Sequence, residues 1–221
     1  MKKMIAPTLA CADLMNVSKD IQILDEMGVC TYHIDIMDGN FVPNYCLSFD
    51  FIRQLRNITN TPIDVHLMTT EVDRDIDISL SLGVEGIAFH IEASGDTRER
   101  LLRIQKCGVK AGIVINPETQ VSSIFPYIDN IDYVLMMGVK PGFSGQKFIN
   151  DTFEKVKELN EYRKQNERSF LIYVDGGITN EIGKVLAELG ADLLVAGKPS
   201  IYRDKGKLRE QTQEFYSAIN S

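Results

Sequence analysis

Cysteines are few in this sequence, and they are not arranged in any paired motif. The 221 residues contain four of them, which are Cys11, Cys30, Cys46 and Cys107. No C-x-x-C spacing occurs, and the spacing does not suggest the disulfide framework of a small domain. We therefore expect reduced thiols and a cytoplasmic location.

Long apolar runs are absent as well. No stretch approaches the ~20 apolar residues that a membrane-spanning helix requires, so we expect no membrane partner. Near the N-terminus a short apolar stretch is interrupted by Pro7 and ends at Asp13, which argues against a signal peptide.

Positive charge is also scarce. Lysine and arginine number 24 against 31 acidic residues, which gives a formal net charge of −7. Nucleic-acid-binding proteins usually present a basic face, so no nucleic-acid partner is expected. An anionic small molecule would have to be held by locally arranged groups, because the overall field opposes it.

The sequence does contain a repeated alternation of short apolar segments with longer amphipathic ones. The short segments are rich in β-branched residues and predict strands at 4–6, 31–36, 63–67, 86–91, 110–115, 133–137, 171–174 and 193–196. Helix-like segments lie between them, among them 13–27, 72–82, 98–106, 151–165 and 182–189. With 44% apolar residues, the chain can form a normal globular core.

Glycines mark the ends of several helix-like segments. Gly28, Gly83, Gly108 and Gly190 each precede the next apolar strand by one or two residues, which suits a helix C-terminal cap. A βα unit repeated about eight times, without linkers, predicts parallel strands. The sequence therefore predicts a (β/α)8 TIM barrel in the α/β class, as one domain over residues 1–221. An open doubly wound sheet is the structural alternative.

The unusual polar residues fall at the C-terminal ends of the predicted strands. The segments concerned are 33–39, 64–68, 90–92, 116–117, 137–145, 175–177 and 197–198. All three histidines, His33, His66 and His90, belong to this set. In a barrel these strand ends form one face, and that face carries the active site.

Four of these side chains suit a divalent cation. His33 and Asp35 are two residues apart on one strand and share a face. Asp64 and His66 repeat this relation, with Asp64 expected one layer deeper. Charged groups inside a barrel are costly unless paired or bound to a metal. The imidazoles of His33 and His66 with the carboxylates of Asp35 and Asp175 could hold one Zn, Fe, Mn or Co ion. A purely structural site is the alternative, although structural zinc is usually richer in cysteine.

Glycines dominate the remaining strand ends. They occur in Pro141-Gly142-Phe143-Ser144-Gly145, in Gly176-Gly177 and at Gly197. Barrel enzymes commonly hold a phosphate near the last two strands with backbone N–H groups and a short helix N-terminus. Pro199 and Ser200 could begin such a helix.

Several motifs together resemble the ribulose-phosphate 3-epimerase family, which includes the similar D-allulose-6-phosphate 3-epimerases. The motifs are HIDIMDGNFVPN at 33–44, DVHLM at 64–68, PGFSGQ at 141–146 and VDGGI at 174–178. The likeness runs from residue 6 to residue 197, and the first motif is highly specific.

The resemblance implies a metal-dependent epimerase of a ketose phosphate. His33, Asp35, His66 and Asp175 would bind the ion, and Asp35 and Asp175 would be the acid/base pair on opposite faces of the substrate. Together, the resemblance and the glycine-rich strand ends give these candidate substrate-binding residues: Thr8, Met37, His66, Met68, Met137, Gly142, Phe143, Ser144, Gly145, Gly176, Gly177, Gly197 and Lys198. Without the resemblance, the methionines would be interpreted as core residues.

Departures from the family pattern leave the sugar open between D-ribulose 5-phosphate and D-allulose 6-phosphate. Thr8 stands where serine is usual, Ser48 and Ser144 stand where glycine is common in the pentulose enzymes, and Lys198 replaces a small residue. The 116–119 segment and the Leu47-Ser48 pair look more like the hexulose branch. Lys198 could contact the phosphate or project into solvent.

Three other functions are considered. A phosphate-binding lyase or decarboxylase would need a reactive lysine at a strand end, whereas Lys110 is at a strand start and Lys140 and Lys198 are in loops. A metal-dependent hydrolase lacks its His-x-His or second-metal ligands. A non-catalytic sugar-phosphate-binding barrel is disfavoured because both histidines and both carboxylates are present. Assembly into a homo-oligomer is left open.

Overall fold

The computed structural model describes residues 3–221, and its strands form one sheet. Eight strands in this range are parallel, and the short β3 is antiparallel to β2. The strands are β1 (Met4–Pro7), β2 (Tyr32–Asp38), β3 (Tyr45–Cys46), β4 (Ile63–Met68), β5 (Gly86–His90), β6 (Lys110–Ile115), β7 (Tyr133–Met137), β8 (Leu171–Asp175) and β9 (Leu193–Ala196). Their order in the sheet is β1-β9-β8-β7-β6-β5-β4-β2-β3.

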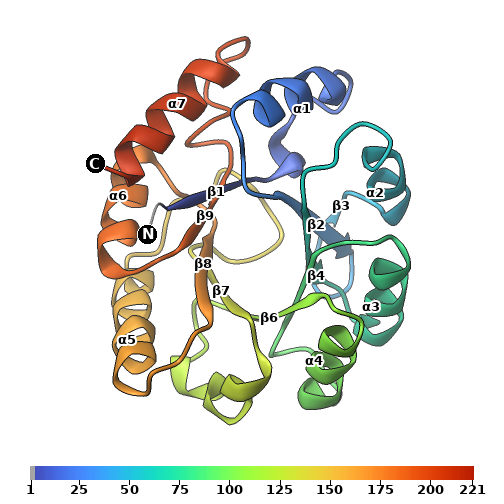
Figure 1. The fold of residues 1–221 in the computed structure, drawn as a ribbon, viewed down its shortest axis with the longest axis vertical. Helices are drawn as coiled ribbons and strands as arrows, with labels where there is room; N and C mark the ends of the chain where they lie inside the picture. Colours follow the sequence, from blue (N-terminus) through green and yellow to red (C-terminus); the bar gives the residue numbers. More distant parts are fainter. Residues whose placement is uncertain (1–2) are drawn as a thin grey trace.

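Helices surround the strands as an outer ring (Figure 1). They are α1 (Val17–Glu26), α2 (Phe49–Leu55), α3 (Val72–Ser81), α4 (Thr97–Lys106), α5 (Asp151–Gln165), α6 (Asn180–Leu189) and α7 (Leu208–Ile219). Two 3-10 segments, η1 (Leu9–Cys11) and η2 (Val121–Asn130), complete the set. Because Pro126 lies inside η2 and lacks a backbone N–H, this connection does not form a regular α-helix.

The sheet closes on itself between β1 and β2. Thr8 and His33 form a parallel bridge, and the Cys30 amide donates to the Ile5 carbonyl at 3.2 Å. The predicted (β/α)8 barrel is therefore confirmed, and the open doubly wound sheet is wrong. Asn220 Oδ1 accepts a hydrogen bond from the Lys3 amide at 2.8 Å, so α7 ends beside the start of β1.

Two apolar layers support this closure. The larger layer lies between the strands and the helices, and it includes Ile34, Val65 and Phe215. The smaller layer fills the barrel interior, where the rings of Tyr133 and Tyr173 stack with centroids 4.5 Å apart. The interior is thus a packed core, and the strand ends above it are left to carry polar groups.

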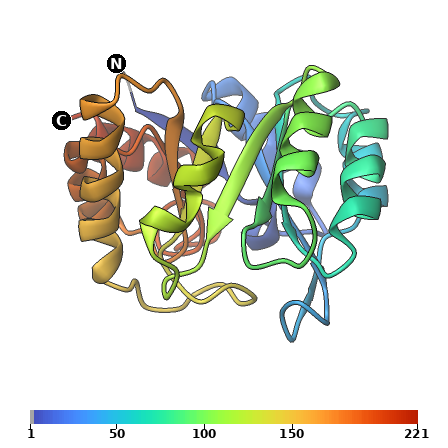
Figure 2. The same ribbon diagram turned by 90° about the horizontal axis from the view of Figure 1, so that it is seen from below.

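The C-terminal ends of the strands lie along one edge of the barrel, where the longest connections also gather. In Figure 2 the β2–β3 hairpin and the loop between β7 and α5 project on this lower side. The four predicted cap glycines after α1, α3, α4 and α6 all have positive φ angles, between 66° and 115°, as expected for a left-handed cap. Within residues 3–221, none of the helices combines the length and apolar character that a bilayer crossing requires.

Candidate active site

Pairing between β2 and β4 stacks inward-facing side chains in layers. His33 pairs with Asp64, Asp35 pairs with His66, and Met37 pairs with Met68. Since alternate residues of a strand face the same side, these pairs point into the barrel while Tyr32, Ile34 and Ile36 pack outward. Asp64 therefore lies one layer below His66, as predicted.

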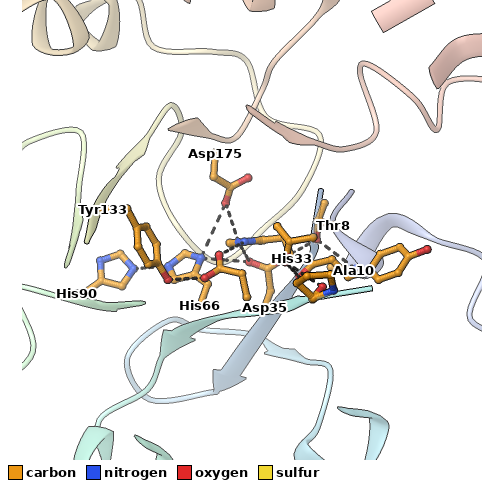
Figure 3. A network of polar contacts seen from close by, with 12 residues as sticks. Thr8, Ala10, His33, Asp35, His66, His90, Tyr133 and Asp175 are labelled. Carbon is orange, nitrogen blue, oxygen red and sulfur yellow. Dashed lines mark hydrogen bonds and ion pairs between the residues drawn. The ribbon is translucent and has the colours of Figure 1, made fainter. Parts of the chain in front are cut away.

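Four side chains converge on one point toward the C-terminal end of the barrel (Figure 3): His33, Asp35, His66 and Asp175. Each offers one ligand atom, and these atoms lie within 4.8 Å of one another. Nε2 of His33 lies 3.5 Å from Asp35 Oδ1 and 3.9 Å from Asp175 Oδ2. Nδ1 of His66 lies 3.2 Å and 3.9 Å from the same two oxygens. We call these four residues the side-chain half of the site.

The donor set of the side-chain half fits a divalent cation. Nε2 of His33 is buried and has no hydrogen-bond partner within residues 3–221, which is unfavourable for a polar atom. Burial would lower the pKa of His33, but the nearby Asp35 and Asp175 carboxylates raise it well above its usual value. The cluster thus favours a positive charge between its carboxylates. A divalent cation bound by the two imidazoles and two carboxylates would supply that charge.

Each imidazole is held from outside the cluster. Nδ1 of His33 lies 3.1 Å from Asp64 Oδ2, and Asp64 accepts a second hydrogen bond from the Tyr133 hydroxyl. Nε2 of His66 lies 2.9 Å from Nε2 of His90. These contacts occupy the outer nitrogens and leave the inner nitrogens directed at the cluster. Such outer contacts orient metal-binding histidines.

The two carboxylates have opposite electrostatic environments. Burial would raise the pKa of Asp35, but the nearby imidazoles of His33 and His66 hold it well below its usual range. Thr8 adds a hydroxyl that donates to Asp35 Oδ2 at 2.6 Å. Burial and the charge of Asp35 raise the pKa of Asp175 to about 7. One carboxylate therefore favours the ionised form while the other favours the protonated form.

A cavity of about 690 Å³ opens directly above the quartet. Of the substrate-binding residues that the sequence predicted, twelve line it: Thr8, Met37, Met68, Met137, Gly142, Phe143, Ser144, Gly145, Gly176, Gly177, Gly197 and Lys198. Asp35 and Asp175 also line it. The remaining one, His66, is fully buried and contributes to the cluster below rather than to the cavity wall.

Five glycines also line the cavity, and we call Gly142, Gly145, Gly176, Gly177 and Gly197 the glycine half. The first four of these have φ angles between 70° and 116°. At Gly177 a Cβ atom would lie only 2.9 Å from the backbone nitrogen of Phe148. A side chain is thus excluded there, because the turn after β8 packs directly against the backbone that precedes α5.

The chain after Gly197 differs from the expected short helix. Residues 198–203 form turns, and the Gly197 carbonyl accepts backbone hydrogen bonds from Ser200, Ile201 and Tyr202. The hydroxyl of Ser200 also accepts from the Gly197 amide at 3.0 Å. Because the bonds converge on a single carbonyl, they make one turn and do not continue as a helix.

Part of the cavity wall was not predicted. Leu14, Cys11, Tyr45 and Cys46 all line it, and they belong to η1, its following loop and the β2–β3 hairpin. The hairpin is joined to the opposite wall by Asn44, whose amide donates to the Gly142 carbonyl at 2.7 Å. Of these wall residues, only Asn44 belongs to a motif identified in the sequence, the one at 33–44.

The residues that suggested a hexulose substrate separate into two groups. Leu47, Ser48 and Ser144 line the cavity, and Ser48 also caps α2 by accepting a hydrogen bond from the Phe51 amide. The 116–119 segment does not line the cavity, but lies behind the site, where it contacts Glu92. Its likeness to the hexulose branch therefore says nothing about direct contact with the sugar.

Comparison with known proteins agrees with this geometry. The model of the ribulose-phosphate 3 epimerase family matches residues 4–201. A ribulose-phosphate 3-epimerase of Aquifex aeolicus (strain VF5) is 39% identical over 220 residues, which are 99% of this chain and 98% of that protein. One of Bacillus subtilis (strain 168) is 39% identical over 194 residues, or 87% and 89% of the two chains.

Solved structures extend the comparison to the fold. The 3-hexulose-6-phosphate synthase from Salmonella typhimurium superposes with a TM-score of 0.72 at 13% identity, over 98% of both chains. Orotidine 5'-phosphate decarboxylase from Pyrococcus horikoshii OT3 gives 0.70 at 15% identity, over 99% of this chain and 100% of that one. At such low identity these likenesses establish a shared barrel and no shared reaction.

Proposed function

We propose, from the premise that this chain belongs to the ribulose-phosphate 3 epimerase family, that it interconverts D-ribulose 5-phosphate and D-xylulose 5-phosphate. The observation that carries the proposal is the placement of Asp35 and Asp175, which reach one cluster from β2 and β8 and both line the cavity. The names of the relatives support the pentulose phosphate as the substrate.

The two aspartates would divide the proton transfers between them. Inversion at C3 requires removal of a proton from one face of the carbon and delivery of a proton to the other. Asp35 comes from β2 and Asp175 from β8, so they approach the cavity from different sides (Figure 3). An ionised Asp35 can accept a proton, and a protonated Asp175 can donate one; the reverse reaction exchanges these roles.

His33, Asp35, His66 and Asp175 would hold one divalent ion. Zn, Fe, Mn and Co all suit two imidazoles and two carboxylates. When bound, the ion supplies positive charge beside the substrate oxygens on which the negative charge of the ene-diolate develops. The imidazoles are proposed only to hold the ion, because the two outer contacts already occupy their other nitrogens.

The glycine half would hold the phosphate. Backbone N–H groups in glycine-rich turns bind anions without requiring a positive net charge, which suits a chain of charge −7. Lys198 lines the same end of the cavity and would add a point charge. Met37, Met68 and Met137 would cover the reacting carbons with an apolar surface.

A second candidate reaction is the epimerisation of D-allulose 6-phosphate to D-fructose 6-phosphate. Ser48 and Ser144 favour it, because both hydroxyl-bearing residues line the cavity where the pentulose enzymes commonly have glycine. The hexulose is longer by one hydroxymethylene unit, and such a unit can interact with additional hydroxyl groups.

Both proposals are tested by measuring kcat/KM for the two sugar phosphates in D2O. We expect the pentulose to be preferred and one deuterium to appear at C3 of the product. A preference for the hexulose would favour the second reaction. Absence of C3 exchange with either sugar, after reconstitution with each of the four metals, would contradict the epimerase mechanism itself.

We also propose a cytoplasmic location. The support is limited to the thiols: Cys11, Cys30, Cys46 and Cys107 are all free in the structure, as is usual in a reducing compartment.

A further inference from the structure

His90 is the last residue of β5 and Glu92 follows two positions later, yet neither is part of the quartet. We propose that they are positioning residues, which hold His66 in the one tautomer that can bind a metal ion through Nδ1. The inference rests on the proposed metal-dependent function. It assigns the third histidine of the chain a role through another residue, not a contact with the substrate.

The packing around His90 leaves its ring a single orientation. It is fully buried, and it stacks on His66 with centroids 5.0 Å apart and an interplanar angle of 30°. On another side it contacts the ring of Phe41, whose centroid is 4.8 Å away. Each nitrogen of His90 then has one partner: Nε2 faces His66 Nε2 at 2.9 Å, and Nδ1 faces Glu92 Oε2 at 3.2 Å.

These partners determine where the protons lie. A carboxylate only accepts hydrogen bonds, so Nδ1 of His90 must carry the proton that it shares with Glu92. A neutral imidazole has one N–H, and burial disfavours the charged form. Nε2 of His90 is therefore an acceptor, and Nε2 of His66 must donate to it. His66 is left with a lone pair on Nδ1, the atom that lies 3.2 Å from Asp35 Oδ1. Because a carboxylate oxygen is also an acceptor, this nitrogen and Asp35 can face each other only across a shared cation.

Glu92 is itself held by hydrogen-bond donors alone. Its Oε1 accepts from the Asn116 amide at 2.9 Å and from the hydroxyl of Thr119. The loop that supplies these donors is clamped from α5, because Lys155 Nζ donates to the carbonyls of Asn116, Pro117 and Thr119. A continuous series of polar contacts thus runs from α5 through this loop to Glu92 and on to the side-chain half.

An amide cannot replace the Glu92 carboxylate in this series. In Glu92→Gln, the amide NH2 must face either His90 or the donors of the 116–119 loop. If it faces His90, then Nδ1 of His90 becomes the acceptor and its Nε2 becomes the donor. Nε2 of His66 would then have to accept this hydrogen bond, so His66 would carry its proton on Nδ1. A protonated Nδ1 cannot bind an ion.

The experiment measures Co2+ binding to the metal-free full-length protein, by competition titration and by the visible absorption of the bound ion. Glu92→Gln and His90→Leu should each weaken Co2+ binding by about 10- to 100-fold. His90→Gln should bind Co2+ more tightly than His90→Leu and approach the wild-type affinity. The glutamine amide offers an acceptor to His66 and a donor to Glu92. Glu118→Gln removes a charge from the same loop, where Glu118 forms an exposed ion pair with Lys140, and should bind Co2+ like the wild type.

Thermal melts of the metal-free variants separate positioning from general damage. The inference expects the affinity loss in Glu92→Gln even where the melting temperature of the metal-free protein is unchanged. Wild-type affinity and spectrum in both Glu92→Gln and His90→Leu would overturn the positioning role while leaving the metal site intact. No Co2+ binding by the wild-type protein would overturn the metal site as well, so the two failures are distinct.

Discussion

The side-chain half and the glycine half face the same cavity but present polar groups in opposite ways. The side-chain half places two buried imidazoles, the buried Asp35 and the partly buried Asp175 on β2, β4 and β8. Residues outside the quartet contact both imidazoles and Asp35. The glycine half has no side chains, and its backbone lines the cavity. In the side-chain half, replacing one carboxylate oxygen by nitrogen is expected to remove a proton-transfer group. In the glycine half, adding a methyl group is expected to disturb the backbone.

The first prediction tests the side-chain half. Asp175→Asn should lower kcat by about 10²- to 10⁴-fold, because general acid–base catalysis contributes that much. Proton exchange at C3 should be lost in the direction that uses this base. Folding should survive, because the change removes a buried carboxylate without altering its shape.

The readouts are kcat, deuterium incorporation at C3 and the melting temperature. Asp50→Asn is a suitable control, since the Asp50 side chain is 78% exposed. Near-normal turnover by Asp175→Asn would contradict the assignment of the proton transfers to two aspartates.

The second prediction concerns the glycine half. Gly177 has a φ of +70°, and a Cβ there would lie 2.9 Å and 3.0 Å from backbone atoms of Phe148. Gly177→Ala should lower the free energy of unfolding by about 1–3 kcal/mol. It should raise KM for the sugar phosphate about tenfold, the equivalent of one charge-assisted hydrogen bond.

Gly206 provides the matched control for this change. Its φ of +79° is similar, but nothing lies within 4 Å of an added Cβ. Gly206→Ala should therefore show the backbone strain without the change in KM. Equal KM values for the two alanine variants would mean that the close approach at Gly177 has no part in substrate binding.

The third and smallest expected effect is on the pH dependence of the free energy of unfolding. It concerns Glu92, which contacts His90 behind the side-chain half. Burial would raise the pKa of Glu92, but hydrogen bonds from His90, Thr119 and Asn116 lower it from 4.5 to about 2. A depressed pKa stabilises the folded protein above about pH 4.5, and this contribution is lost as the pH falls toward 2. Glu92→Gln should thus flatten the acid side of the stability curve of the metal-free protein.

Urea unfolding at several pH values between 5 and 2 checks this slope. Asp38→Asn is the comparison, because hydrogen bonds from Thr70, Phe41 and Asn40 likewise outweigh burial and lower the pKa of Asp38 to about 2. Its carboxylate has no contact with a histidine. A slope unchanged in Glu92→Gln but reduced in Asp38→Asn would show that the Glu92 contacts add nothing to stability.

Much of the fold could be predicted because the βα unit repeats. All eight parallel strands were expected within one or two residues of their observed bounds, since each is a short apolar run with a clear end. The short α2 and β3 and the C-terminal α7 were not identified. The repeated βα unit also predicted a regular helix after β6. The segment there forms 3-10 turns instead, and Pro126 lies inside it.

The side-chain half was accessible for a related reason. Alternation along a strand determines which residues share a face, so His33 with Asp35, and the C-terminal ends of parallel strands, could be placed together without coordinates. The resemblance to the epimerase family is confirmed by the match over residues 4–201. The tautomers of the histidines could not be predicted, because they depend on contacts such as His66 with His90 that join different strands.

The cavity walls were least predictable. Asn44 reaches the Gly142 carbonyl across 98 positions of the sequence, and neither residue signals the other. Tyr45 and Cys46 are placed in the wall by their pairing with β2 and by this contact, which joins the hairpin to the loop after β7. The residues that choose between sugars lie in such loops, which explains why the motifs indicated a reaction class before they indicated a substrate.

The seam of the barrel has a consequence for how the protein is made. Thr8, which donates to Asp35, follows β1, and β1 is paired with β9 from Met4–Leu193 to Pro7–Ala196. During synthesis β1 can meet β2 early, but its other edge must wait for β9, the last strand to be made. Contacts between distant parts of a chain form late because closing long loops is entropically costly. The carboxylate proposed to accept the substrate proton thus reaches its final surroundings only when nearly the whole polypeptide has left the ribosome, so an incomplete chain has no working centre.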